Sequence, residues 1–293
     1  DERPDVLRRW RVLIDATPEA LAAMRPFVHL TTPEFAPVRY KTQFFTCELP
    51  QGEQPEVLPG ELDAGRFFAP EALLSSWSMG ELLVVPPALF LLKLLRGTSL
   101  ATGLERARAA GAKLEAGCLH EVRTVPGIWM LPLRTPTIPP ATTTNAYLIG
   151  EEELYLVDPA TYEQSERERL FAFVDGLLAE GRRLVGVLVT HHHLDHVGSV
   201  QVAAERYRVP VCAHPLTLER LPVEPREARA LHDLEPIRLG HAPDGSPDWE
   251  LVAYHTPGHD RGHLAFVESR YHAALVGDLV ATMRTTISAN RGL

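Results

Sequence analysis

The chain has 293 residues, of which 45% are hydrophobic and 23% charged, and its formal net charge is −9 at pH 7. These proportions are ordinary for a soluble globular protein, and the length predicts about two domains. No apolar stretch approaches the roughly 20 residues of a membrane span, because the longest, Leu82–Leu95, is interrupted by prolines and Lys93. We therefore expect no membrane partner.

Cysteine content and the N-terminus bear on localisation. The three cysteines, Cys47, Cys118 and Cys212, lie far apart and form no Cys-x-x-Cys pair. An odd number argues against a disulfide framework, so we predict reduced thiols in a cytoplasmic protein. The start carries no signal peptide, and Asp1 is not an initiator methionine. We expect that the N-terminus has been processed or trimmed.

The first 115 residues contain no cluster of metal ligands and no glycine-rich phosphate loop. The expected elements are strands over 38–48 and 60–68 and helices that begin at Pro70, over 88–95 and over 97–111. Pro70 suits a helix start, where no amide donor is needed. Phe44 and Phe45 are predicted core residues of the first strand.

This segment resembles the C-terminal part of a Nudix domain, in Arg39–Phe45 and in the Gly60-Glu61-Leu62 sequence. The Gly, Arg-Glu and paired-Glu box that gives Nudix enzymes their chemistry is absent. The resemblance implies a partial α/β accessory domain over residues 1–115, which serves packing or substrate selection. Residues 116–140 are proline-rich and join the two halves.

The second half alternates strand and helix patterns, which predicts an α/β layered domain. Strands are expected over 128–133, 154–157, 184–189, 209–213, 251–254 and 271–276, and helices over 163–179 and 197–206. The stretch Pro222–Pro247 is rich in proline and acidic residues and is predicted to be a long loop that contributes to specificity.

The stretch Thr190–His196 reads Thr-His-His-His-Leu-Asp-His and directly follows the apolar run 184–189. Imidazoles and carboxylates are the ligands that Zn²⁺ prefers. His191 and His193 are two residues apart and project the same way from an extended loop, whereas Asp195 and His196 begin the next helix. One segment can therefore supply ligands to two adjacent metals. A solvated loop that is merely histidine-rich is the weaker interpretation.

Two further strand ends carry potential ligands. His259 follows the run 251–254 and a Pro257-Gly258 turn, and Asp278 follows the run 271–276. Strand ends of this kind are where α/β domains build their sites.

With these residues, the part from about Leu119 to Leu293 resembles the metallo-β-lactamase-fold hydrolases, in a branch that includes glyoxalase II and a β-lactamase-like endoribonuclease. The resemblance implies a four-layer αββα sandwich over residues 116–293. It implies a first metal held by His191, His193 and His259. Asp195 and His196 would hold the second metal, and Asp278 would bridge both.

Asp158, at the end of the run 154–157, matches the family's first motif. The resemblance implies a carboxylate that orients a ligating histidine, while a turn residue before Pro159 is the structural alternative. For Asp195 we expect two roles, as ligand and as proton acceptor for the nucleophile. His192 is expected to face away from the metals. His263 is expected either to touch substrate or to make a hydrogen bond at a strand start.

The family supplies a last histidine to the second metal from beyond the bridging aspartate. Here fifteen residues follow Asp278 and none is histidine. We expect that the sequence is shortened at its C-terminus, with the first metal site complete and the second weakened.

The implied function is zinc-dependent hydrolysis, in which a metal-bound hydroxide cleaves an ester, thioester, lactone or phosphodiester. One or two Zn²⁺ per chain are expected, with Mn²⁺ or Fe²⁺ as alternatives. Two other functions stay open: an endoribonuclease acting on single-stranded RNA, and a non-catalytic metal-containing binding protein.

Charge bears on the choice between small-molecule and RNA substrates. Residues 119–293 carry 16 Arg and no Lys against 23 acidic residues, a net charge of −7. Such a domain binds long nucleic acid poorly, which favours a small-molecule substrate over RNA. Two divalent ions would reverse the field locally. Homo-oligomer formation stays open.

Overall fold

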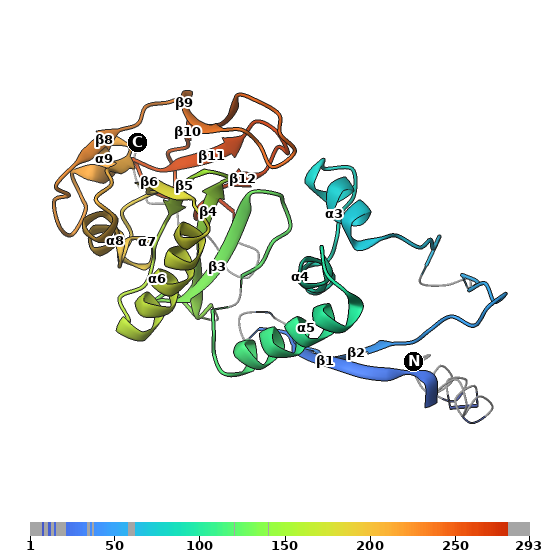
Figure 1. The fold of residues 1–293 in the computed structure, drawn as a ribbon. Coiled ribbons are helices and arrows are strands. Elements are labelled where there is room, and N and C mark those ends of the chain that lie inside the picture. The colour runs from blue at the N-terminus through green and yellow to red at the C-terminus, as the bar shows by residue number, and fades with distance from the viewer. Residues whose placement is uncertain are drawn as a thin grey trace. The chain divides into compact units, whose positions relative to one another are not determined.

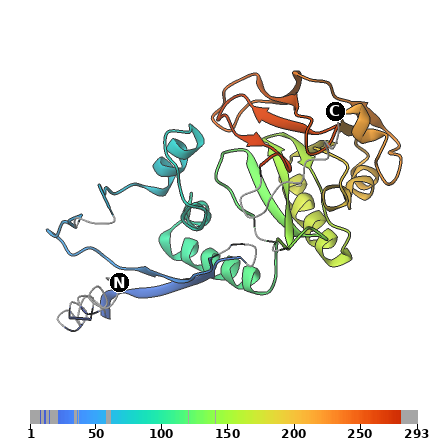
Figure 2. The same ribbon diagram turned by 180° about the vertical axis from the view of Figure 1, so that it is seen from behind.

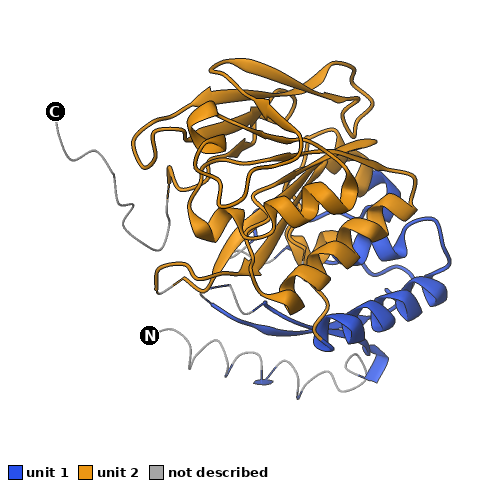
Figure 3. Cartoon of the chain, turned by 90° about the vertical axis from the view of Figure 1, so that its left-hand side faces the viewer, with its two compact units in different colours: residues 1–72, 90–116 blue, residues 73–89, 117–293 orange. Residues whose placement is uncertain are grey.

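A computed structural model describes residues 22–33, 36, 38–57, 62–119, 121–139 and 141–280, together with residues 8, 11, 12 and 15. The chain divides into two compact units (Figure 3): residues 1–72 with 90–116, and residues 73–89 with 117–293. The second unit therefore takes in residues 73–89, which the prediction of a single boundary after residue 115 did not anticipate. In the described residues, no helix is long and apolar enough to cross a membrane.

The first unit is built around a two-stranded antiparallel sheet of β1 (Arg25–Thr31) and β2 (Lys41–Thr46). Helix α5 (Leu100–Glu115) packs on β1 and begins at Ser99, whose hydroxyl accepts the amide of Thr102 at 3.2 Å. Helices α3 (Pro70–Ser78) and α4 (Pro86–Leu95) each cross from one unit to the other. The small core of this unit contains Val28, Leu91 and Ala107.

Two predictions for this region are wrong. Phe45 is 47% exposed, whereas Phe44 packs against the core, because neighbouring side chains of a strand point to opposite faces. The strand expected over 60–68 is also absent from the part that the structure describes, where residues 62–69 form neither helix nor strand. Residues 58–61, which carry part of the Nudix resemblance, lie outside the described residues.

Two sheets dominate the second unit (Figures 1 and 2). The larger has the order β3-β4-β5-β6-β7-β8 and the smaller the order β12-β11-β10-β9. The larger sheet contains β3 (Ile128–Arg134), β4 (Thr143–Gly150), β5 (Glu153–Val157), β6 (Arg183–Leu188), β7 (Val211–Ala213) and β8 (Ala228–Ala230). The smaller contains β9 (Glu235–Gly240), β10 (Trp249–His255), β11 (Leu264–Glu268) and β12 (Ala274–Leu275). Strands β5 to β8 run parallel, and all other pairs are antiparallel.

The central strands of the larger sheet are buried on both faces, as the alternation along β5 illustrates. Leu154 and Leu156 join the core beneath helices α6 (Gln164–Ala179) and α8 (Val200–Tyr207). Tyr155 and Val157 face the second core, between the two sheets. The described residues thus form three layers, helix, sheet and sheet, which confirms the expected α/β architecture. A second helical layer of the expected four-layer sandwich is not among them.

Several elements differ from the prediction. The stretch 222–247, expected as a loop, contains β8 and β9. The helix expected over 197–206 is divided into α7 (Leu194–Val197) and α8 around Gly198, where a Cβ would lie 2.6 Å from the Ala160 carbonyl oxygen. Besides β8 and β9, three further strands, β1, β4 and β11, and the short helix α9 (Pro215–Leu218) were not predicted.

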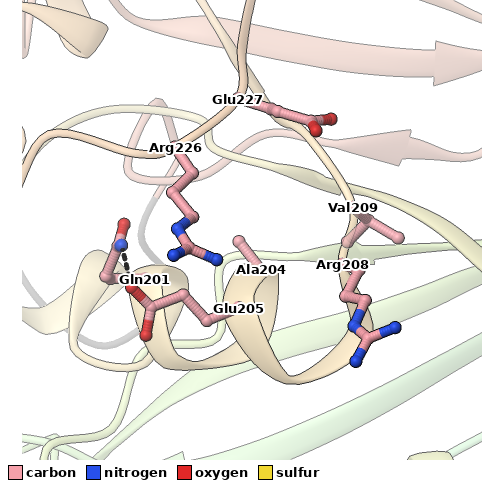
Figure 4. A pocket seen from close by; sticks show the side chains of 7 residues that line it. All are labelled: Gln201, Ala204, Glu205, Arg208, Val209, Arg226 and Glu227. Carbon is pink, nitrogen blue, oxygen red and sulfur yellow. Dashed lines mark hydrogen bonds between the residues drawn. The ribbon is translucent and has the colours of Figure 1, made fainter.

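A surface pocket of about 230 Å³ lies beside α8 (Figure 4). It is lined by Gln201, Ala204, Glu205, Arg208, Val209, Arg226 and Glu227. Val209 and Glu227 closely precede β7 and β8 in the chain. The pocket is therefore at the amino ends of the parallel strands, whereas the histidine motif lies at their carboxyl ends.

Candidate metal centre

The predicted ligands meet where the carboxyl ends of β5 and β6 face the ends of strands from the smaller sheet. Asp158 follows β5 and His191 follows β6, and the Asp158 amide donates to the Leu188 carbonyl at 3.0 Å. The Thr190 carbonyl accepts the amide of Leu264, at the start of β11, at 2.8 Å. This bond fixes the loop between β10 and β11 against the loop after β6.

The first group of potential ligands is His191, His193 and His259. The His193 Nδ1 atom lies 3.1 Å from His191 Nε2 and 2.9 Å from His259 Nε2. His191 is fully buried, and the other two are partly buried. Burial, followed by the neighbouring imidazoles, lowers the pKa values of His191 and His193, so both rings are held neutral.

The second group is His191, His196 and Asp278, whose ligand atoms lie within 4.8 Å of one another. His196 lies on α7, and its Nε2 is 3.2 Å from Asp278 Oδ1. The other oxygen of Asp278 is 3.5 Å from His259 Nε2. The two carboxylate oxygens of Asp278 therefore face one residue of each group, as expected for a bridging ligand.

Asp158 is 2% exposed and is hydrogen-bonded to His196 on the side away from Asp278. Its Oδ2 accepts the Nδ1 proton of His196 at 2.9 Å. Burial opposes a charge on His196, but its hydrogen bonds to Asp158 and Asp278 outweigh burial and raise the pKa of His196 to about 10. The φ angle of Asp158 is +45°, a left-handed conformation that aspartate tolerates better than most residues.

Asp195 is the predicted metal ligand that the structure does not bring into either group. It is partly buried in the first turn of α7, and its charge acts on His193 and on Tyr162. Any role of Asp195 as a metal ligand therefore stays a proposal.

The donor set fits a divalent metal ion. Imidazole nitrogens that face one another at about 3 Å need a shared proton or a cation, and burial disfavours the proton on His191 and His193. Neutral imidazoles with a carboxylate are the ligands of catalytic zinc and iron sites. Four histidines and a carboxylate, arranged in two overlapping groups, suit two adjacent ions.

A family model, described as the Metallo-beta-lactamase superfamily, matches residues 139–289. The chain belongs to this superfamily. The matched region includes every residue of the two ligand groups and does not extend over the first unit, so the Nudix resemblance stays a prediction.

The alignments with similar proteins cover only part of this chain and part of each relative. A probable metallo-hydrolase, YybB of Bacillus subtilis (strain 168), is 29% identical over 166 residues, which cover 53% of this chain and 66% of the relative. A hydroxyacylglutathione hydrolase of Rhodopseudomonas palustris (strain BisA53) is 35% identical over 130 residues, or 42% of this chain and 46% of the relative. The alignments thus span from under half to about two thirds of these relatives' length.

Among solved structures, a metallo-beta-lactamase family protein from Thermus thermophilus is 25% identical with a TM-score of 0.44, covering 55% of this chain and 62% of that one. Another structure, described as di-iron-bound, is 27% identical with a TM-score of 0.41, covering 55% of this chain and 79% of that one.

Residues adjacent to the two groups were only partly anticipated. His192 Nδ1 lies 3.1 Å from the buried carboxylate of Asp260, and both residues form a further candidate group with His193, so the expected orientation of His192 away from the metals stays a prediction. Asp260 itself, held by the Gly262 amide at 2.8 Å, was not predicted, because nothing in the sequence around His259 distinguishes it from a turn residue. Thr190 was also not singled out, although it is polar and immediately precedes the motif.

His263 is fully buried. Its Nδ1 is hydrogen-bonded to the Thr256 hydroxyl at 2.8 Å, and its amide donates to the Asp260 carbonyl at 3.3 Å. Of the two roles expected for His263, the structure supports the hydrogen bond at a strand start. Burial lowers the pKa of His263 to about 4.

Proposed function

We propose that the chain is a metal-dependent hydrolase that binds two adjacent divalent ions. The observation that carries the proposal is the placement of Asp278, whose two oxygens face His196 of one ligand group and His259 of the other. A carboxylate placed in this way can hold two adjacent ions, one through each oxygen, as in the two-metal sites of hydrolytic enzymes. Zinc is the preferred ion, with iron and manganese as alternatives.

The proposed roles follow from the nitrogen atoms that face the centre. His191 and His259 would bind the first ion through Nε2, and His193 would bind it through Nδ1. His196 would bind the second ion through Nε2, because Asp158 occupies its Nδ1. Such an ion lowers the pKa of bound water from 15.7 to about 7, which provides hydroxide at neutral pH.

Asp195 is proposed to complete the second ion's ligands and to accept a proton from the nucleophile. Its place in the first turn of α7, one residue before His196, supports this role.

The proposed substrate class is a thioester, with esters, lactones and phosphodiesters as the broader set. Support comes from several relatives whose name is hydroxyacylglutathione hydrolase, at 27 to 40% identity over part of their length. The excess of acidic residues after residue 119 disfavours RNA.

The test combines metal content with activity. Protein prepared without chelator and without a histidine tag is analysed for metal per chain, and initial rates are measured on an acyl thioester, a lactone, a simple ester, a phosphodiester and single-stranded RNA. We expect about two metals and thioester cleavage. His259→Ala should lower the metal content and reduce kcat/KM by a factor of about 100 or more.

The matched control is His241→Ala, because His241 is exposed and lies outside the ligand groups of the described residues. A His259→Ala protein with full activity would contradict the site. Cleavage of RNA alone would favour the endoribonuclease, and bound metal without any hydrolysis would favour the non-catalytic binding protein.

A further inference from the structure

Thr190 immediately precedes His191, the residue that belongs to both ligand groups. It is 1% exposed, and its hydroxyl oxygen touches two different parts of the centre. Oγ1 is 2.6 Å from Asp158 Oδ2 and 3.0 Å from His191 Nδ1. The Thr190 amide also donates to Asp158 Oδ1 at 2.8 Å.

The direction of these hydrogen bonds follows from what each atom can offer. A carboxylate oxygen only accepts, so the single hydroxyl proton of Thr190 is used in the bond to Asp158. Thr190 Oγ1 must then accept from His191, which places the proton of His191 on Nδ1. The lone pair of His191 is left on Nε2, the atom that faces His193.

The same carboxylate oxygen fixes the second group. Asp158 Oδ2 accepts from Thr190 and from His196 Nδ1, which directs His196 Nε2 towards Asp278. One hydroxyl therefore contacts His191 directly and His196 through a single shared oxygen. Removing this hydroxyl would take away the acceptor of the His191 Nδ1 proton and one of the donors that orient the Asp158 carboxylate, which in turn orients His196.

We propose that Thr190 is a positioning residue shared by both metal positions, which sets the metal-binding nitrogen of His191 directly and that of His196 through Asp158. The inference rests on the proposed metal centre, but its first readout does not need a metal. Partners of this kind typically change metal affinity about 10- to 100-fold.

The first experiment measures histidine tautomers in the metal-free protein by long-range ¹H–¹⁵N NMR. In the wild type, His191 should be the Nδ1-protonated tautomer. Thr190→Val has nearly the same shape but no hydroxyl, and it should shift His191 towards the Nε2-protonated form. Thr190→Ser retains the hydroxyl and should restore the wild-type spectrum.

The second experiment measures the affinity for each of two Co²⁺ ions by competition titration and visible spectroscopy. Thr190→Val should weaken both ions about 10-fold or more, whereas Thr190→Ser should stay within a few-fold of the wild type. Asp158→Asn should be non-additive with Thr190→Val, because the two residues act through one hydrogen bond.

Thr144→Val is the matched control. Thr144 is a buried threonine on β4 whose hydroxyl bonds to the Thr135 hydroxyl at 2.8 Å, and it belongs to neither ligand group. It should cost stability but leave both metal affinities unchanged. The inference would be overturned by an unchanged His191 tautomer in Thr190→Val, by weakening of only one ion, or by Thr190→Ser as impaired as Thr190→Val. A wild type that binds no Co²⁺ would instead refute the proposed function.

Discussion

Gly277 immediately precedes Asp278 in the segment that connects β12 of the smaller sheet to the metal centre. Its φ angle is +49°, a conformation that glycine adopts without strain. A Cβ here would lie 2.8 Å from both His263 Nε2 and Thr190 Oγ1. No carbon atom fits at that distance, so a side chain at Gly277 has to displace one of its two neighbours or the chain that carries Asp278.

Gly277→Ala should therefore reduce the metal content by about one ion per chain and lower the melting temperature Tm. The backbone strain alone costs about 1 kcal/mol, and the overlap adds to it. Gly245→Ala is the control, because Gly245 has φ +85° but nothing within 4 Å of its Cβ position. Elemental analysis and thermal unfolding check both variants, and equal effects of the two would contradict the close approach at Gly277.

At the scale of elements, the turn between β11 and β12 is organised by one buried acid. Glu268 is fully buried, and its carboxylate accepts the Trp249 indole proton at 2.8 Å and the amides of Arg270, Tyr271 and Ala273. Because β12 leads directly to Asp278, this carboxylate also supports the strand end from which that residue comes.

Glu268→Ala should destabilise the protein by roughly 3 kcal/mol or more, since several donors would lose their acceptor at once. Denaturant unfolding with and without metal measures the change. Glu224→Ala, at an exposed position between α9 and β8, should change stability by less than about 0.5 kcal/mol. A loss for Glu268→Ala as small as that of the control would be inconsistent with the role of the carboxylate.

A second link joins the β9–β10 turn to the β11–β12 turn. Asp244 accepts from Arg270 Nε at 2.6 Å. Burial alone would raise the pKa of Asp244, but the Arg270 guanidinium and the amide of Ser246 outweigh it and hold that pKa below its usual range. A depressed pKa contributes stability above about pH 3.9, and this stability is lost as the pH falls below that value.

Between about pH 4 and 3, Tm of the metal-free wild type should therefore fall more steeply than Tm of Asp244→Asn. The two proteins should have parallel curves above about pH 5. Chelator is present throughout, so that the acid loss of metal does not contribute. Parallel curves over the whole range would show that the pair does not couple to pH.

At the scale of the molecule, the strong periodic elements of the second unit could be predicted, because local pattern was sufficient for them. The first ligand group and Asp278 were expected from the family resemblance, whereas the second group contains His191 where Asp195 was expected. The missed elements depend on distant partners: β8 is three residues long and exposed, and it exists because it pairs with β7. The role of Thr190 could not be predicted either, because it depends on a hydrogen bond to Asp158, 32 residues earlier in the chain.

Residues 73–89 also belong to the second unit because of contacts with residues that are distant in the sequence. The ring of Trp77 lies 5.4 Å from the Arg123 guanidinium, and the Tyr271 hydroxyl donates to the Ser78 carbonyl at 2.7 Å. The partners are far apart in the chain, and no periodicity in 73–89 points to them. Helix positions could therefore be predicted here, but unit membership could not.

Removing the metal should lower the stability of the second unit. Ions present at about 100 times their dissociation constant contribute about 2.7 kcal/mol each, which corresponds to roughly 5–10 °C in Tm. Thermal unfolding with and without chelator measures this shift, and adding Zn²⁺ back should reverse it. An unchanged Tm would contradict tight binding to the folded chain.

The two sheets contribute ligands to the same centre: His191 and His196 follow strands of the larger sheet, and His259 and Asp278 follow strands of the smaller. The complete site therefore exists only when both sheets are in place. A bound ion would link the two sheets, so we expect it to slow unfolding while leaving the folding rate almost unchanged. Metal would then determine the lifetime of the native state more than the ease of reaching it.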